Sequence, residues 1–81
     1  MRLIVATGTS PDVCSWIERV DDTFQLTKTS ALQWAMKTCF DDEDGSLYAE
    51  GYEIEVGVGG EYLITPRGYE EFGVVVLLIE E

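Results

Sequence analysis

Residues 48–65 read YAEGYEIEVGVGGEYLIT, and apolar and polar side chains alternate through the first half of this segment. A period of two is typical of an antiparallel strand that has one face in the core and the other in water. One face carries Tyr48, Glu50, Tyr52, Ile54, Val56 and Val58, and the other carries Gly51, Glu53, Glu55 and Gly57. The segment therefore predicts an amphipathic strand of an antiparallel sheet.

The glycines at 59–60 predict a hairpin turn that leads into a second strand. The length of the loop fixes the register of the two strands. A three-residue loop pairs Ile54 with Ile64, whereas a two-residue loop sets Val58 against Glu61. We expect the three-residue loop.

Apolar segments near both ends of the chain predict two buried strands. Residues 2–6 form a short run rich in β-branched side chains, and residues 72–79 are almost unbroken in their apolar character. A strand that is apolar on both sides must be covered on both faces or lie centrally in its sheet. We therefore expect the first and last strands to be central.

A first helix is predicted over residues 11–20. Ser10 suits the N-cap, Pro11 suits the first helical position, and apolar residues recur at helical spacing. The apolar positions of this stripe are Val13, Trp16, Ile17 and Val20. Residues 23–27 alternate and predict a short strand after this helix.

A second helix is predicted over residues 31–40, where Ser30 and Gln33 fit a capping box. Its apolar stripe consists of Leu32, Ala35, Met36, Cys39 and Phe40. Four acids follow at 41–44, next to the negative end of the helix dipole, which is locally unfavourable. Violations of local rules tend to lie at functional sites, so this acidic run is a candidate site.

These elements predict one α+β domain over residues 1–81, because a chain of this length encloses a single core. The expected order is β-α-β-α-β-β-β. Both helices are expected to pack on one face of a mixed, mainly antiparallel sheet of about five strands.

The charge of the chain is unevenly distributed along the sequence. Residues 1–40 carry four acids and four bases, whereas residues 41–81 carry twelve acids and only Arg67 as a base. The whole net charge of −11 therefore belongs to the second half. Solubility alone needs a net charge of roughly 2–8 in a small domain, so the excess calls for a second explanation.

This charge argues against direct binding of nucleic acid or of anionic membranes, since both depend on Lys and Arg. A basic protein is the better partner. The apolar run at 3–6 is too short for a secretion signal or a membrane span, which favours a cytoplasmic protein, of a bacterial host if the gene is carried by a phage.

Enzymatic chemistry is not expected. The chain has no histidine, which excludes Ser-His and Cys-His dyads, and Cys14 and Cys39 are read as free thiols. Residues 40–51 resemble a calcium loop only in part, because Phe40 and Gly51 occupy positions that require carboxylates. We expect no metal and no cofactor, and a carboxylate-based metal binder is a third hypothesis.

The candidate partner-binding surface combines acids of the second half with tyrosines, which are enriched at protein interfaces. Its residues are Asp41, Asp42, Glu43, Asp44, Glu50, Glu53, Glu55, Glu61, Glu70, Glu71, Tyr48, Tyr52, Tyr62 and Tyr69. Glu53 and Glu55 would project from one strand face about 7 Å apart, a spacing of the same order as that of phosphates along a nucleic acid. A sheet face that is simply wet explains the same pattern about as well.

In size and composition the chain looks like small acidic inhibitors such as phage anti-restriction and anti-CRISPR proteins and nuclease-immunity proteins. The resemblance rests on no motif. It implies a nucleic-acid mimic that blocks the basic groove of a nuclease or of a CRISPR effector subunit. The alternative is a structural or assembly module that forms a homodimer, in which the acids serve solubility.

Overall fold

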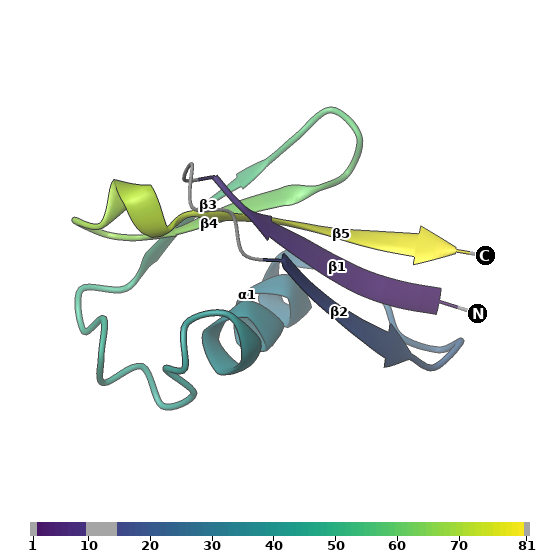
Figure 1. Ribbon diagram of the computed structural model, residues 1–81, viewed down its shortest axis with the longest axis horizontal. Helices are drawn as coiled ribbons and strands as arrows, with labels where there is room; N and C mark the ends of the chain where they lie inside the picture. The colour runs from purple at the N-terminus through teal and green to yellow at the C-terminus, as the bar shows by residue number, and fades with distance from the viewer. Residues whose placement is uncertain (1, 10–14, 81) are drawn as a thin grey trace.

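A computed structural model of the chain describes residues 2–9 and 15–80, which form a single five-stranded sheet with one α-helix (Figure 1). The elements in chain order are β1 (Arg2–Gly8), β2 (Ser15–Val20), α1 (Lys28–Thr38), β3 (Tyr52–Val56), β4 (Tyr62–Pro66), the 3-10 helix η1 (Glu70–Phe72) and β5 (Val74–Glu80). Helix α1, with 11 residues, is too short to cross a lipid bilayer, and no other described segment forms a longer helix.

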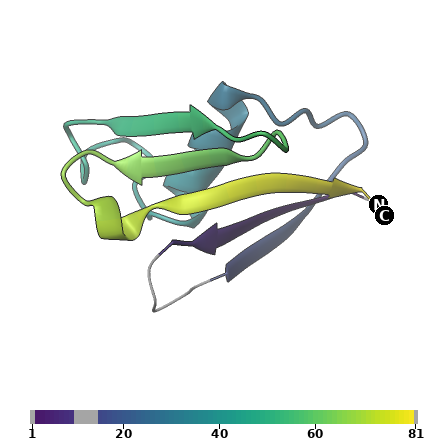
Figure 2. The same ribbon diagram turned by 90° about the horizontal axis from the view of Figure 1, so that it is seen from above.

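The strands follow the order β2-β1-β5-β4-β3, and each neighbouring pair is antiparallel. The expectation that the first and last strands are central is confirmed, since β1 and β5 are neighbours inside the sheet. Two hairpins, β1–β2 and β3–β4, form its two edges. The helix connects these edges, because it follows β2 in the chain and precedes β3 (Figure 2).

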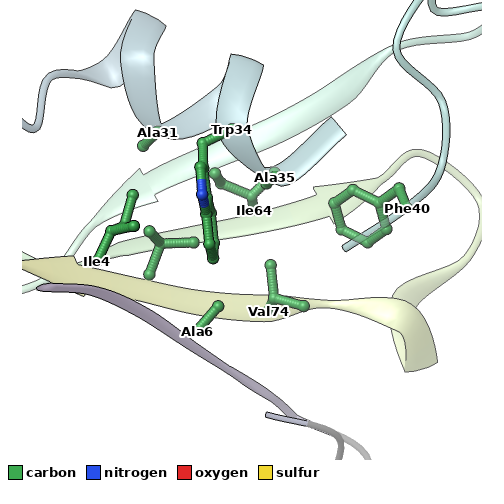
Figure 3. Packing of buried hydrophobic residues seen from close by; sticks show 9 residues of the cluster. Ile4, Ala6, Ala31, Trp34, Ala35, Phe40, Ile64 and Val74 are labelled. Carbon is green, nitrogen blue, oxygen red and sulfur yellow. The ribbon is translucent and has the colours of Figure 1, made fainter. Parts of the chain in front are cut away.

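Helix α1 lies against one face of the sheet and supplies the core contacts on that side. Ala31, Trp34 and Ala35 point at the sheet, where they meet small and branched apolar side chains (Figure 3). The sheet residues of this buried cluster are Ile4, Ala6, Ile64, Val74 and Val76, and Phe40 closes it at the end of the helix. The indole N–H of Trp34 donates to Glu18 Oε2 at 3.1 Å, so the one polar atom of the ring is satisfied.

The predicted second helix is present, but it begins three residues before the predicted start. Thr27 is the N-cap, and its Oγ1 accepts from the backbone N–H of Ser30 at 3.1 Å. Ser30 Oγ in turn accepts from the backbone N–H of Thr27 at 2.8 Å. The capping box is therefore one turn earlier than predicted, with Ser30 as its last residue instead of its first.

The predicted fold class is wrong, because the described chain has one α-helix instead of two and a sheet that is antiparallel instead of mixed. Residues 15–20, predicted as helix, form β2 and pair with β1. Trp16 and Val20 are four positions apart, and this spacing puts two side chains on the same face of a helix and also on the same face of a strand. The hydrogen-bonded pairing with β1 stabilises the strand. The predicted helix start at Ser10 and Pro11 lies outside the described residues.

The short strand predicted at 23–27 is also wrong, because this segment is an irregular connection to the helix. Asp21 caps a turn here: its Oδ1 accepts from the backbone N–H of Thr23 at 2.9 Å. The guanidinium of Arg2 donates to the backbone carbonyls of Asp22 and Phe24. Backbone groups that would need a partner strand are thus satisfied by side chains instead.

The hairpin prediction is confirmed in its register. Ile54 is opposite Ile64, and the backbone N–H of Gly57 donates to the carbonyl of Glu61 at 2.8 Å, which leaves a loop of three residues. Gly60 has a φ of 85°, a conformation that favours glycine. The strand is shorter than predicted, since it begins at Tyr52, and the residues before it form turns.

Candidate partner-binding surface

Two acidic segments that are far apart in the sequence lie together at the end of the molecule away from the termini (Figures 1 and 2). The backbone N–H of Arg67 donates to the carbonyl of Gly51 at 3.0 Å, and the rings of Tyr48 and Tyr69 have centroids 5.2 Å apart. We call this region the acidic end and define it by its exposed acids. These are Asp41, Glu43, Asp44, Glu50, Glu70 and Glu71.

Asp42 is not part of this surface, because only 2% of the residue is exposed. Its Oδ1 accepts from the backbone N–H of Leu47 at 2.7 Å. Its Oδ2 accepts from the backbone N–H of Tyr48 at 3.2 Å and from the hydroxyl of Tyr52 at 2.7 Å. The carboxylate therefore organises the loop after the helix, and this role accounts for one of the four acids at the helix end.

The pKa of Asp42 reflects two opposing effects. Burial acts to raise it, but the hydrogen bonds from Tyr52, Leu47 and Tyr48 together outweigh burial, so the pKa lies below its ordinary value of 3.8. Burial, and after it the same hydrogen bond, raise the pKa of the Tyr52 hydroxyl. Near neutral pH the pair is thus a carboxylate that accepts from a neutral phenol.

Asp44 shapes the next turn of the loop. Its Oδ1 accepts from the backbone N–H of Ser46 at 3.0 Å and from the Ser46 hydroxyl at 2.7 Å. These two bonds lower the pKa of Asp44. The side chain of Asp44 is nevertheless exposed, so it contributes both to the loop and to the charge of the acidic end.

A row of aromatic rings runs from the core to the surface of the acidic end. Successive centroids are 5.3 Å apart from Phe40 to Tyr52, 5.9 Å from Tyr52 to Tyr48, and 5.2 Å from Tyr48 to Tyr69. The last pair, Tyr69 and Phe72, is stacked with an interplanar angle of 4°. Each of these two residues is 46% exposed, so an apolar pair with π faces lies among the carboxylates.

The charges of the acidic end have no counter-ion within the part of the chain that the structure describes. Two ion pairs are present there: Arg2 with Glu80 at 3.1 Å and Arg67 with Glu53 at 3.3 Å. Neither involves an acid of the acidic end. The six carboxylates are therefore unpaired within the described chain, and Arg67, the one base of the two segments, pairs with Glu53 instead.

Glu53 and Glu55 belong to a different surface, the sheet face that α1 does not cover. With Glu70 they line a shallow hollow of about 300 Å³, and the other residues around it are Thr9, Leu63 and Thr65. Glu70 thus lies between this hollow and the acidic end. Among the residues described, no group of three or more acids or cysteines has the arrangement of a metal site.

The predicted surface is accordingly only partly contiguous. The six acids named above and Tyr69 gather at the acidic end, and Glu53 and Glu55 adjoin them through Glu70. The remaining members lie elsewhere: Asp42, Tyr48 and Tyr52 are packed inside the loop, Tyr62 packs against the core, and Glu61 lies at the β3–β4 hairpin. The structure leaves only Tyr69, of the four predicted tyrosines, with an exposed ring.

Phe72 was missed by the sequence analysis. It was assigned to the start of the last strand, but it lies in η1, where its ring stacks on Tyr69. Side chains three residues apart are eclipsed in a 3-10 helix. The sequence signal for this stacked pair is the three-residue spacing of Tyr69 and Phe72, directly after the turn residues at 66–68.

No protein-family model matches the chain, and searches of the curated proteins and of the solved structures find no similar protein.

Proposed function

We propose that this protein is a non-catalytic binding protein whose acidic end docks on a basic surface of another protein. The partner class is a protein that binds nucleic acid in a basic groove, such as a nuclease or a CRISPR effector subunit. Bound there, the acidic end excludes the nucleic acid and inhibits the partner. The site of action is the cytoplasm.

One observation carries the proposal. Two segments, 41–51 and 67–72, bring six exposed acids to the same end of the molecule as a stacked aromatic pair, and none of these acids forms an ion pair with a described residue. Carboxylates at such a surface steer a basic partner toward it and speed association. The rings of Tyr69 and Phe72 add flat faces on which an arginine of the partner can stack.

The test is displacement of a fluorescent DNA duplex from purified basic-groove proteins, namely restriction nucleases and CRISPR effector complexes. We expect the protein to displace the duplex from its target. The variant Glu70→Gln/Glu71→Gln should require roughly tenfold more protein for the same displacement, because each change removes a carboxylate that faces the partner.

The matched control is Asp22→Asn/Glu61→Gln, which removes the same two charges from positions outside the acidic end. We expect it to displace the duplex as well as the original protein does, within about twofold, because distant charges are screened over about 8 Å at physiological salt. Equal losses in both variants, or no displacement from any protein of the panel, would contradict the proposal.

A further inference from the structure

The sheet face opposite α1 carries a continuous apolar surface that no described residue covers. Figure 2 looks onto this face, with the helix behind the sheet. Its apolar members alternate with the buried residues along the strands and are Leu3, Val5, Ile17, Leu63, Val75, Leu77 and Ile79, while the polar residues of the same face, Thr7, Ser15, Arg19, Glu53, Glu55 and Thr65, lie toward its margins. We call this surface the open face.

The centre of the open face differs from the usual outer face of an antiparallel sheet, which is polar. Ile17 is 70% exposed, and Leu77 and Ile79 are each 38% exposed. Ile17, Val5 and Leu77 are directly opposite one another on β2, β1 and β5, so they form one apolar row across three strands. Contiguous apolar surface of this kind marks an interaction site.

The charges at the margins of the open face indicate what covers it. Arg19 lies on the edge strand β2 and is opposite Leu3, near the chain termini. Glu55 lies on the other edge strand, β3, and is opposite Leu63, nearer the acidic end. The two charges are therefore at diagonally opposite corners of one face. Neither Arg19 nor Glu55 forms an ion pair with a residue in the described part of the chain. Arg67 pairs with Glu53 and not with Glu55.

From this arrangement we infer that the open face binds a second copy of the chain. Consider a two-fold axis that lies in the plane of the interface and is perpendicular to the line from Arg19 to Glu55. This axis places each Arg19 over Glu55 of the other copy. It also places the apolar residues of one copy over those of the other. An isologous interface requires this kind of self-complementarity. The two sheets then form a sandwich with crossed strands and a second core about 10 Å thick.

The size of the face indicates a small and weak interface. Five strands spaced about 4.8 Å apart, each about six residues long with a rise of about 3.4 Å, give a footprint of roughly 500 Å² per copy. The pair then buries roughly 1,000 Å², near the lower limit for a specific interface. We expect a dissociation constant in the range of about 1–100 μM.

The inference does not depend on the proposed function, because the acidic end and the open face are different surfaces. It is tested by sedimentation equilibrium of the full chain from about 1 to 500 μM, a range chosen from the affinity above. We expect the mass to rise from that of the 9.1 kDa monomer toward that of a dimer. A monomer throughout this range overturns the inference.

Variants locate the interface. Leu77→Glu should raise the dissociation constant at least about 100-fold, since it places an unpaired charge at the centre of the contact. Ile17→Glu, on the exposed edge strand, is a second variant with the same expectation, and circular dichroism verifies that both remain folded. The control is Val58→Glu, the same charge change at the fully exposed hairpin tip, which should leave the constant unchanged. A folded Leu77→Glu or Ile17→Glu protein that dimerises normally overturns the inference.

Charge exchange tests the two-fold arrangement itself. Arg19→Glu should raise the dissociation constant roughly tenfold, because it creates a like-charge contact with Glu55 at two places in the dimer. The double variant Arg19→Glu/Glu55→Arg should return it to within about threefold of the original value. A double variant as weak as Arg19→Glu alone rules out this axis.

Discussion

The bond between Tyr52 and Asp42 offers a direct test of how the acidic end is built. Tyr52→Phe removes one hydroxyl that donates to Asp42 Oδ2 at 2.7 Å and leaves the aromatic row intact. A hydrogen bond to a charged group contributes about 1.5–3 kcal/mol. Tyr52 itself is only half-buried, so we expect the lower part of this range, about 1.5 kcal/mol.

The assay is urea unfolding at pH 7, followed by circular dichroism, with thermal unfolding as a second measurement. A loss of about 1.5 kcal/mol corresponds to a decrease in Tm of roughly 6–12 °C for a domain of this size. Tyr69→Phe is the matched control, since its ring is 46% exposed and its hydroxyl has no hydrogen bond to a described residue. We expect it to change the free energy of unfolding by less than about 0.5 kcal/mol.

The effect should also depend on pH, with a sign set by the lowered pKa of Asp42. A carboxyl whose pKa is lower in the folded than in the unfolded protein stabilises fully above the unfolded pKa of 3.8 and loses this contribution as the pH falls through the folded pKa. The difference in the free energy of unfolding between Tyr52→Phe and the original protein should therefore become smaller below pH 3.8. A difference that is absent at pH 7, or equal at pH 7 and pH 3, refutes the assigned role of this bond.

Three further predictions concern the rest of the domain. Ile64→Ala should lower the free energy of unfolding by about 3 kcal/mol, measured by urea titration, because Ile64 is completely buried between the sheet and α1. Gly60→Ala should cost about 1 kcal/mol in the same titration, since alanine at a φ of 85° is strained, although space for the methyl group is open. In a Cys14→Ser background, Cys39 should react slowly with a thiol reagent at pH 8 and quickly in urea, because burial raises the pKa of its thiol to about 12. Comparable rates in both conditions would contradict that burial.

A dimer through the open face would present two acidic ends, one on each copy. Two linked sites raise the apparent affinity for a partner with repeated basic surfaces without any new contact. The monomeric Leu77→Glu protein should then bind an isolated basic site normally and lose affinity only for a repeated one.

The sequence alone determined those features that depend on local pattern. The alternation before Gly59 and Gly60 set the hairpin and its register, since a shift by one residue would turn the apolar face of the strand toward water. The unbroken apolar run at 72–79 placed the last strand inside the sheet. The charge asymmetry, likewise, needed only the order of the residues.

Tertiary structure decided the features that depend on partners distant in the chain. Trp16 and Val20 satisfy the spacing of both a helix and a strand, and only the free edge of β1 selects the strand. Asp42 reads as one acid in an exposed run, and only the hydroxyl of Tyr52 and two backbone N–H groups draw it into the interior. The acidic end and the open face exist because the sheet order brings separate segments together, and strand order is a non-local property that a local pattern does not contain.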